Sequence, residues 1–254
     1  MKAVLSSEWV KLRSVTSTFH TVGAAAAMVV LGIAWTVYVS ALADERGMLR
    51  AAAPEEGFLP LVQLSLAVLG VLTITSEHAT GMIRTSLVVV PRRSTLFLAK
   101  TGIVALATFA TATSILLLTY VTSRLIAGER QLGFNESAFT DDLPALLASG
   151  LSVTALALVG LGLGAAMRST AGALVSVVSL LFVLPGAVNY LPAPWNTRIA
   201  TLLLPNLIPQ IASERMSSRL GDGFLPPWAA LAVLFAYPLV TLTIGYYALK
   251  RKDA

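Results

Sequence analysis

Long apolar segments alternate with short polar ones along the chain, and this pattern predicts its helices. Each apolar segment comes close to the ~20 residues that a helix needs to cross a bilayer. The six segments lie near residues 20–42, 58–76, 95–126, 143–167, 170–191 and 227–249. The pattern therefore predicts an all-α integral membrane protein, with residues 20–254 forming one transmembrane domain of six helices.

The segment ahead of the first span, residues 1–19, is amphipathic. Its apolar side chains recur at helical spacing and form one face, with the cations away from that face. The face comprises Leu5, Trp9, Leu12, Thr16 and Phe19, and the cations are Lys2, Lys11 and Arg13. This pattern predicts a helix in the cytoplasmic membrane interface, with Trp9 at headgroup depth and its cations on anionic lipid. An ordinary basic leader is the alternative, since basic residues commonly precede a first span.

A second irregular segment precedes the last span. Residues 199–212 are an apolar run interrupted by Pro205 and Pro209. The run is too short to span a bilayer, and prolines break a continuous helix. We therefore expect a re-entrant or interfacial helix pair on the outer side.

Composition agrees with a membrane protein. Of the 254 residues, 56% are hydrophobic and 12% are charged, and the mean hydropathy is +0.78. A soluble domain carries about 25% charged residues. The chain has no cysteine, which excludes disulfides and thiolate metal sites. The net charge of +5 does not by itself indicate nucleic acid, and we expect no nucleic-acid partner, because in a membrane protein the placement of Lys and Arg matters more than their sum.

The placement of charge orients the spans. With both termini cytoplasmic, the inner side holds 11 of the 18 basic residues and only three of the 13 acidic ones. Membrane proteins concentrate Lys and Arg on the cytoplasmic side. The sequence therefore predicts cytoplasmic termini and a cytoplasmic loop at residues 77–94.

Motifs for catalysis and for autonomous energy coupling are missing from the sequence. There is neither a Gly-x-Ser-x-Gly elbow nor a phosphate-binding Gly-x-x-x-x-Gly-Lys-Ser/Thr loop. The two histidines, His20 and His78, lie at membrane edges and far apart in the chain, so a two-histidine zinc site at helical spacing is absent. The spans also lack a midplane carboxylate for proton coupling. Gly160, Gly162 and Gly164 lie inside a span, where small residues favour close helix packing over nucleotide binding. We therefore expect no enzyme activity and no metal or cofactor in this chain.

One polar, basic segment, residues 76–100, interrupts the apolar pattern between the second and third spans. Its charges, such as Glu77, Arg84 and Lys100, would cost several kcal/mol each in the bilayer core. The segment is therefore expected at the membrane surface, where it can meet a partner.

Residues 77–87, read as EHATGMIRTSL, resemble the first cytoplasmic loop of type-2 ABC exporter permeases. In that family an acidic residue is followed four positions later by glycine and then by a basic residue. Residues 8–14, read as EWVKLRS, resemble the leader of actinobacterial members. The six spans, the cytoplasmic termini and the broken outer helix also fit, so the resemblance covers essentially the whole chain.

The resemblance implies a permease subunit in a bacterial plasma membrane. A second permease chain, identical or related, would complete a twelve-span dimer. Two separate ABC ATPase subunits would bind ATP and magnesium and drive export. The outer helix near residues 199–212 would cap the path between the two permease chains.

The resemblance also implies roles for single residues. Residues 77 to about 90 would form a coupling helix in a cleft of the ATPase, and the coupling residues are Glu77, His78, Gly81, Arg84 and Thr85. Glu77 and Arg84 would pair with charges of the ATPase, and Gly81 would permit close approach. The interfacial helix, through Trp9, Leu12 and Arg13, would brace the same subunit.

Simpler interpretations remain open for this loop. Glu77 and Arg84 could form a solvated pair worth under about 1 kcal/mol, and Gly81 could be a turn glycine. A non-transporting membrane protein, such as an immunity or sensor-anchoring subunit, could use the same loop only to bind a partner.

Overall fold

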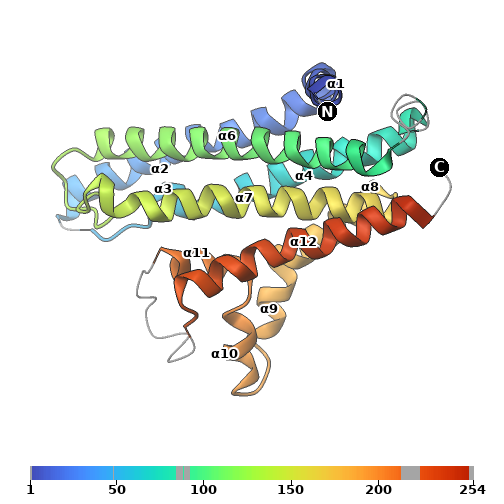
Figure 1. Cartoon of the computed structure of the whole chain (residues 1–254). Coiled ribbons are helices and arrows are strands. Elements are labelled where there is room, and N and C mark those ends of the chain that lie inside the picture. Colours follow the sequence, from blue (N-terminus) through green and yellow to red (C-terminus); the bar gives the residue numbers. More distant parts are fainter. Residues whose placement is uncertain (1, 48, 84–87, 89–91, 213–223, 252–254) are drawn as a thin grey trace.

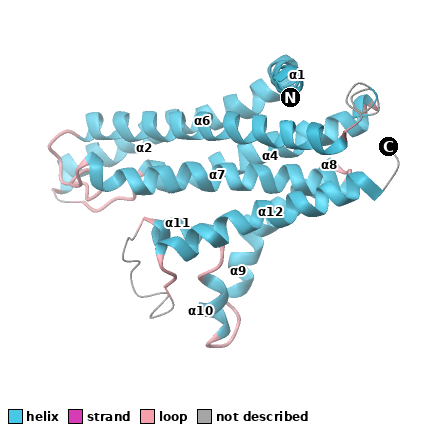
Figure 2. Cartoon of the chain, in the orientation of Figure 1, coloured by secondary structure: helices cyan, strands magenta, loops and turns pink. Residues whose placement is uncertain are grey.

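The computed structural model describes the chain except for residues 1, 48, 84–87, 89–91, 213–223 and 252–254. Every regular element in the described part is a helix (Figure 2). Six helical segments there are long and apolar enough to cross a membrane. They are α2 (Thr16–Arg46), α4 (Leu59–Ala79), α6 (Arg93–Ala127), α7 (Phe139–Met167), the segment Thr170–Val188, and α12 (Pro227–Arg251). The predicted all-α, six-span architecture is confirmed.

The amphipathic leader is shorter than predicted. Helix α1 is Lys2–Ser14, and Val15 is extended, with φ −88° and ψ 124°, so that α2 begins at Thr16. Thr16 and Phe19 therefore belong to the first long helix. Figure 1 shows α1 nearly end-on while the long helices run across the view, so α1 lies across one end of the bundle.

Helix α7 is the centre of the bundle and contacts α4, α6 and α12. Of its most apolar stretch 78% is buried, against 22% for α12. Glycines permit this packing: a Cβ added at Gly70 of α4 would lie 2.0 Å from the Ala157 carbonyl oxygen, and one added at Gly162 would lie 2.6 Å from the Thr241 carbonyl oxygen. The expected packing role of the glycine-rich stretch in α7 is confirmed.

The fifth span is bent. It consists of α8 (Thr170–Val178), a π-helical turn (Ser179–Val183) and α9 (Leu184–Val188). Pro185 follows the turn, and its ring lacks an N–H and crowds the carbonyl four residues earlier. A π turn accommodates that disruption. Beyond it, α9 and α10 (Trp195–Ala200) project away from the other helices (Figure 1).

The apolar run at residues 199–212 contains α11 (Leu204–Ile211), which packs on α12 and α7. Pro205 sits in its first turn, where a missing N–H costs little. Gln210, which the sequence analysis did not single out, is buried and joins three segments: its amide donates to the carbonyls of Thr201 and Asn206 and accepts from the Leu225 N–H. The run is divided between α10 and α11 at residues 201–203, whereas Pro209 lies inside α11 and does not end it. Re-entry of this segment into a membrane stays a prediction.

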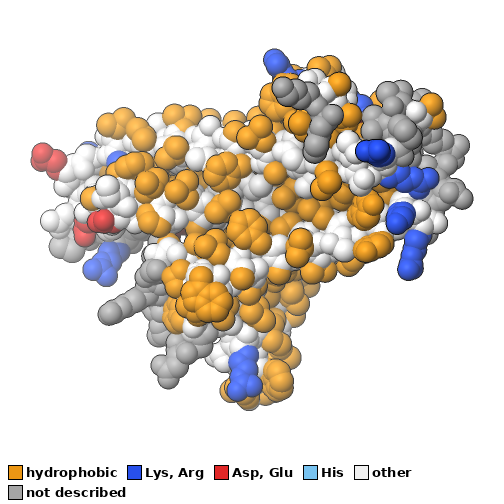
Figure 3. All heavy atoms as spheres, in the orientation of Figure 1, with side chains coloured by type: hydrophobic (Ala, Val, Ile, Leu, Met, Phe, Trp, Pro, Cys, Tyr) orange, Lys and Arg blue, Asp and Glu red, His pale blue; other side chains and the backbone are white. Residues whose placement is uncertain are grey.

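The charge balance changes along the bundle. In Figure 3 the Asp and Glu side chains in view lie at one end together with a few Lys and Arg side chains, and most of the Lys and Arg side chains in view lie at the other end. The latter end holds α1, the end of α4, the start of α6 and the end of α12 (Figure 1). We call it the basic end.

Candidate functional site

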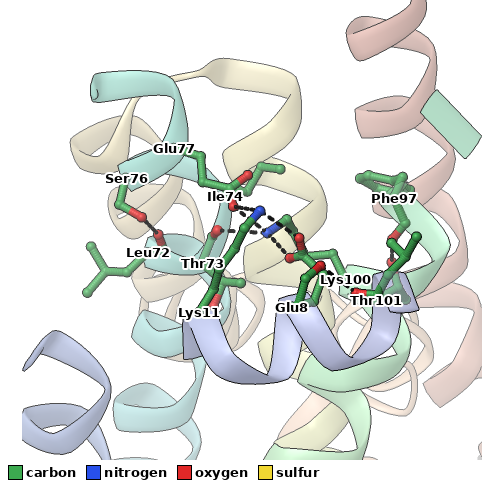
Figure 4. Close-up of polar contacts among 12 residues, drawn as sticks. Glu8, Lys11, Leu72, Thr73, Ile74, Ser76, Glu77, Phe97, Lys100 and Thr101 are labelled. Carbon is green, nitrogen blue, oxygen red and sulfur yellow. Dashed lines mark hydrogen bonds and ion pairs between the residues drawn. The ribbon is translucent and has the colours of Figure 1, made fainter. Parts of the chain in front are cut away.

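Four charged side chains from three helices meet at the basic end (Figure 4). Glu8 and Lys11 come from α1, Glu77 from α4 and Lys100 from α6. The Lys100 Nζ lies 2.5 Å from Glu8 Oε2 and 3.0 Å from Glu77 Oε1, and the Lys11 Nζ lies 2.7 Å from Glu8 Oε1 and 3.0 Å from the same Glu77 Oε1. Each lysine therefore contacts both carboxylates. We call these four residues the Lys100 cluster.

The cluster is buried, with Lys100 2% exposed and Glu8 and Glu77 3% exposed each. Isolated charges would be costly there, but two cations facing two carboxylates balance one another. Burial acts to raise the pKa of Glu8, yet Lys100 and Lys11 outweigh it and the pKa is lowered. Burial likewise acts to lower the pKa of Lys11, and Glu8 with Glu77 raises it instead. The arrangement therefore favours the charged forms of Glu8 and Lys11.

Helical spacing explains why these residues meet. Glu8 and Lys11 are three positions apart and so share one face of α1. Glu77 lies in the last turn of α4 and Lys100 about two turns into α6. Residues 80–92, which join these two helices, therefore begin within one turn of Glu77 and end about two turns before Lys100.

This arrangement corrects the expected orientation of α1. Lys11 was expected to point away from the apolar face of the leader, but it is mostly buried and bonded to Glu8 and Glu77. The face that meets the bundle contains Glu8, Lys11 and Leu12, and Trp9 lies at its edge, 39% exposed. Charged partners on α4 and α6 stabilise the burial of this charged face of α1. The apolar periodicity of the leader alone does not reveal those partners.

The Glu77 carboxylate faces its own chain. Its Oε1 accepts hydrogen bonds from both Lys11 and Lys100, and its Oε2 is buried without a hydrogen-bond partner among the described residues. A hollow of about 40 Å³ beside the cluster is lined by residues that include Glu77, Thr73 and Ser76. The structure therefore puts this carboxylate inside the bundle rather than on its outer surface.

The other predicted coupling residues follow directly in the chain. The His78 Nδ1 lies 2.9 Å from the Ile74 carbonyl oxygen. Gly81 is exposed and has φ +70°, a conformation that side chains disfavour. Ile83 is buried against Ile74 and Phe97 and so ties the loop to the bundle. Arg84 and Thr85 lie outside the described residues.

The residue that follows the loop, Arg93, is also bonded to another helix. Arg93, the first residue of α6, donates from Nη1 to the Leu249 carbonyl at 2.7 Å. Leu249 is in the last turn of α12, where carbonyls lack helical partners. The start of α6 is thus joined to the end of α12 at this end of the bundle.

The residues predicted for the interfacial helix are divided between protein and surroundings. Leu12 is buried, whereas Trp9 and Arg13 are exposed. All three line a groove of about 510 Å³ that runs beneath α1 along α4 and α6. Among the described residues there is no group of three metal-ligating side chains.

Sequence reasoning missed Glu8, Lys11 and Lys100 as site residues. Lys100 carried a usable signal, because it lies inside a predicted apolar span, where a charge commonly has a partner and a role. Glu8 had no comparable signal, since a carboxylate in an amphipathic leader is ordinary.

The fold and site define a multi-pass membrane protein with a charged, helix-joining site at one end. Residues 4–186 match the family described as ABC-2 family transporter protein. The match covers most of the chain, which therefore belongs to the ABC-2 transporter family. Members of this family are membrane components that generally associate with ATPase subunits and dimerise. No curated protein matches the chain.

Proposed function

We propose that the chain is the permease subunit of an ATP-driven exporter and that separate ATPase subunits act on it through residues 77–94. ATP and magnesium bind in those subunits. Two permease chains, identical or related, form the export path, with α10 and α11 near its outer end and both termini in the cytoplasm. Membership in the ABC-2 family supports the permease role.

The observation that carries the coupling proposal is the contact of Lys100 with both Glu8 and Glu77. A force on the loop reaches α4 and α6 directly, and the cluster passes it to α1. Because the Glu77 carboxylate is engaged inside the bundle, we assign it a positioning role. Contact with the ATPase then falls to exposed loop residues such as Gly81 and Met82 and to the outer face of α1.

Two glycines provide a matched test. Gly81 and Gly128 both follow a long helix with positive φ, +70° and +59°, and an added Cβ meets nothing within 4 Å at either. An alanine at either position is strained, because residues with a side chain rarely adopt a positive φ. Gly128 lies at the end of the bundle opposite the loop.

Mild-detergent purification of the tagged full-length chain from its native cell should recover a partner with an ATP-binding phosphate loop, identified by mass spectrometry. In that complex Gly81→Ala should reduce ATP hydrolysis and export severalfold, while Gly128→Ala retains both. Equal effects of the two variants would contradict coupling through the loop. A partner without a phosphate loop would favour the immunity or sensor-anchoring function instead.

A further inference from the structure

The groove beneath α1 is a distinct feature of the basic end. It measures about 510 Å³ and lies between α1, the start of α2, α4 and α6. Its floor is apolar and includes the buried Leu66 and Leu69, and the exposed Leu106 also lines it. The Thr108 hydroxyl, which also lines it, donates to the Val104 carbonyl of its own helix. The inner part of the groove is therefore suited to bind hydrocarbon.

Its position matches the depth of one lipid leaflet. Helix α1 meets α6 at Lys100, and the groove follows α6 over residues 106–111. At 1.5 Å per residue this is about 9–16 Å further along the helix. One leaflet contributes about half of a hydrocarbon core that is ~30 Å thick.

A single cation, Arg13, lines the groove where α1 covers it. Arg13 is exposed, and no described residue forms an ion pair with it, whereas nearby Lys11 is engaged by Glu8 and Glu77. The guanidinium can therefore donate to a phosphate, for which its planar donors are well suited. Trp9 beside it is typical of headgroup depth.

We propose that this groove binds one anionic phospholipid of the surrounding leaflet, with an acyl chain along α4 and α6 and the headgroup phosphate on Arg13. The lipid would contact α1 at Trp9, Leu12 and Arg13, next to the Lys100 cluster. The proposal rests on the chain being a membrane protein and does not depend on coupling to an ATPase.

A second groove offers an internal comparison. It measures about 470 Å³, lies between α6 and α12, and is lined by residues such as Phe97, Leu242 and Tyr246, with no charged side chain among those that line it. It should accept hydrocarbon without preference for lipid charge.

Tryptophan fluorescence can compare the two grooves in the full-length chain. The four tryptophans are Trp9, Trp35, Trp195 and Trp228. Replacing the last three with Phe leaves Trp9 as the reporter in vesicles that contain brominated phosphatidylglycerol or brominated phosphatidylcholine at equal mole fraction. The anionic lipid should show about fivefold stronger apparent binding, as expected for one basic residue near an anionic headgroup.

Matched variants locate the effect. Arg13→Gln should abolish the preference, Arg13→Lys should keep most of it, and Arg251→Gln, which removes a basic charge at the same end, should leave it intact. Ala107→Phe should fill the groove and reduce quenching by both lipids. With Trp9 replaced by Phe as well, Tyr246→Trp should report equal quenching by the two lipids.

Equal quenching of Trp9 by the two lipids would overturn the proposal, because the groove would then hold ordinary annular lipid. A preference that Arg13→Gln leaves unchanged would do the same, since it would arise from the overall charge of the basic end.

Discussion

The two ends of α6 are each held by buried or partly buried charges, and the two arrangements differ. At the opposite end from the Lys100 cluster, Arg124 of α6 lies 2.5 Å from Glu55 of α3 (Pro54–Gly57) and 3.4 Å from Asp142 of α7. The Tyr120 hydroxyl donates to Asp142 at 3.0 Å, and the guanidinium of Arg124 stacks 3.8 Å from the centre of the Tyr120 ring. We call these four residues the Arg124 cluster.

The difference lies in charge balance. The Lys100 cluster has two cations and two carboxylates, whereas the Arg124 cluster has one cation between two carboxylates. Burial raises the pKa of Glu55, and Arg124 does not offset it, while the pKa of Glu8 is lowered. Where buried cations and carboxylates are equal in number, the cations favour the charged form of the carboxylates. Where carboxylates outnumber cations, burial favours the protonated form of a carboxylate.

The largest effect is expected for Lys100→Met. It leaves two buried carboxylates facing only Lys11, and breaking a buried ion pair costs about 3–5 kcal/mol. Thermal unfolding in detergent should show a large fall in melting temperature. Glu8→Gln combined with Lys100→Met leaves the balanced pair of Lys11 and Glu77 and should recover part of the loss. A double variant less stable than Lys100→Met would refute the balance argument.

Arg124→Met should cost less, about 1–3 kcal/mol. The side chains of Asp142 and Arg124 are 25% and 18% exposed, and Glu55 can take up a proton once its cation is gone. The same melting measurement applies. A loss as large as that of Lys100→Met would remove the distinction between the two clusters.

The two clusters should respond to pH with opposite sign. The lowered pKa of Glu8 stabilises the fold above its ordinary value of 4.5, and this contribution is lost as the pH falls below that value. The raised pKa of Glu55 means that its contribution falls as the pH rises from 4.5 through the folded pKa.

Melting curves recorded across this pH range test both signs. Relative to the unmodified chain, Glu8→Gln should lose least stability at low pH and most near neutrality. For Glu55→Gln, the stability relative to that of the unmodified chain should be highest near neutrality. Parallel pH profiles for the two variants would contradict the assigned signs.

The smallest effect is expected for a solvated pair near the Arg124 cluster. Asp44 and Arg130 are joined at 2.8 Å, but their side chains are 57% and 39% exposed. Arg130 donates two hydrogen bonds to the Asp44 carboxylate, yet solvent screens exposed ion pairs. Asp44→Asn should leave the melting temperature unchanged. A clear loss would show that exposure does not separate this pair from the two clusters.

The sequence by itself determined the spans of this protein, because a bilayer requires a fixed length of apolar helix. All six predicted segments lie within four residues of the observed helices at both ends. The first has the largest difference, predicted at 20–42 and observed at Thr16–Arg46. Apolar composition, proline positions and the glycines of α7 act locally and can be read directly.

Only the tertiary structure decided which charges meet. Lys11 and Glu77 are 66 residues apart, and Lys100 and Glu8 are 92 apart. Periodicity along α1 favoured its apolar face, but the energy of burying that helix depends on Glu77 and Lys100, which belong to other helices. Glu8 and Lys11 can pair within α1, but Glu77 and Lys100 gain their partners on α1 only after the three helices have packed together.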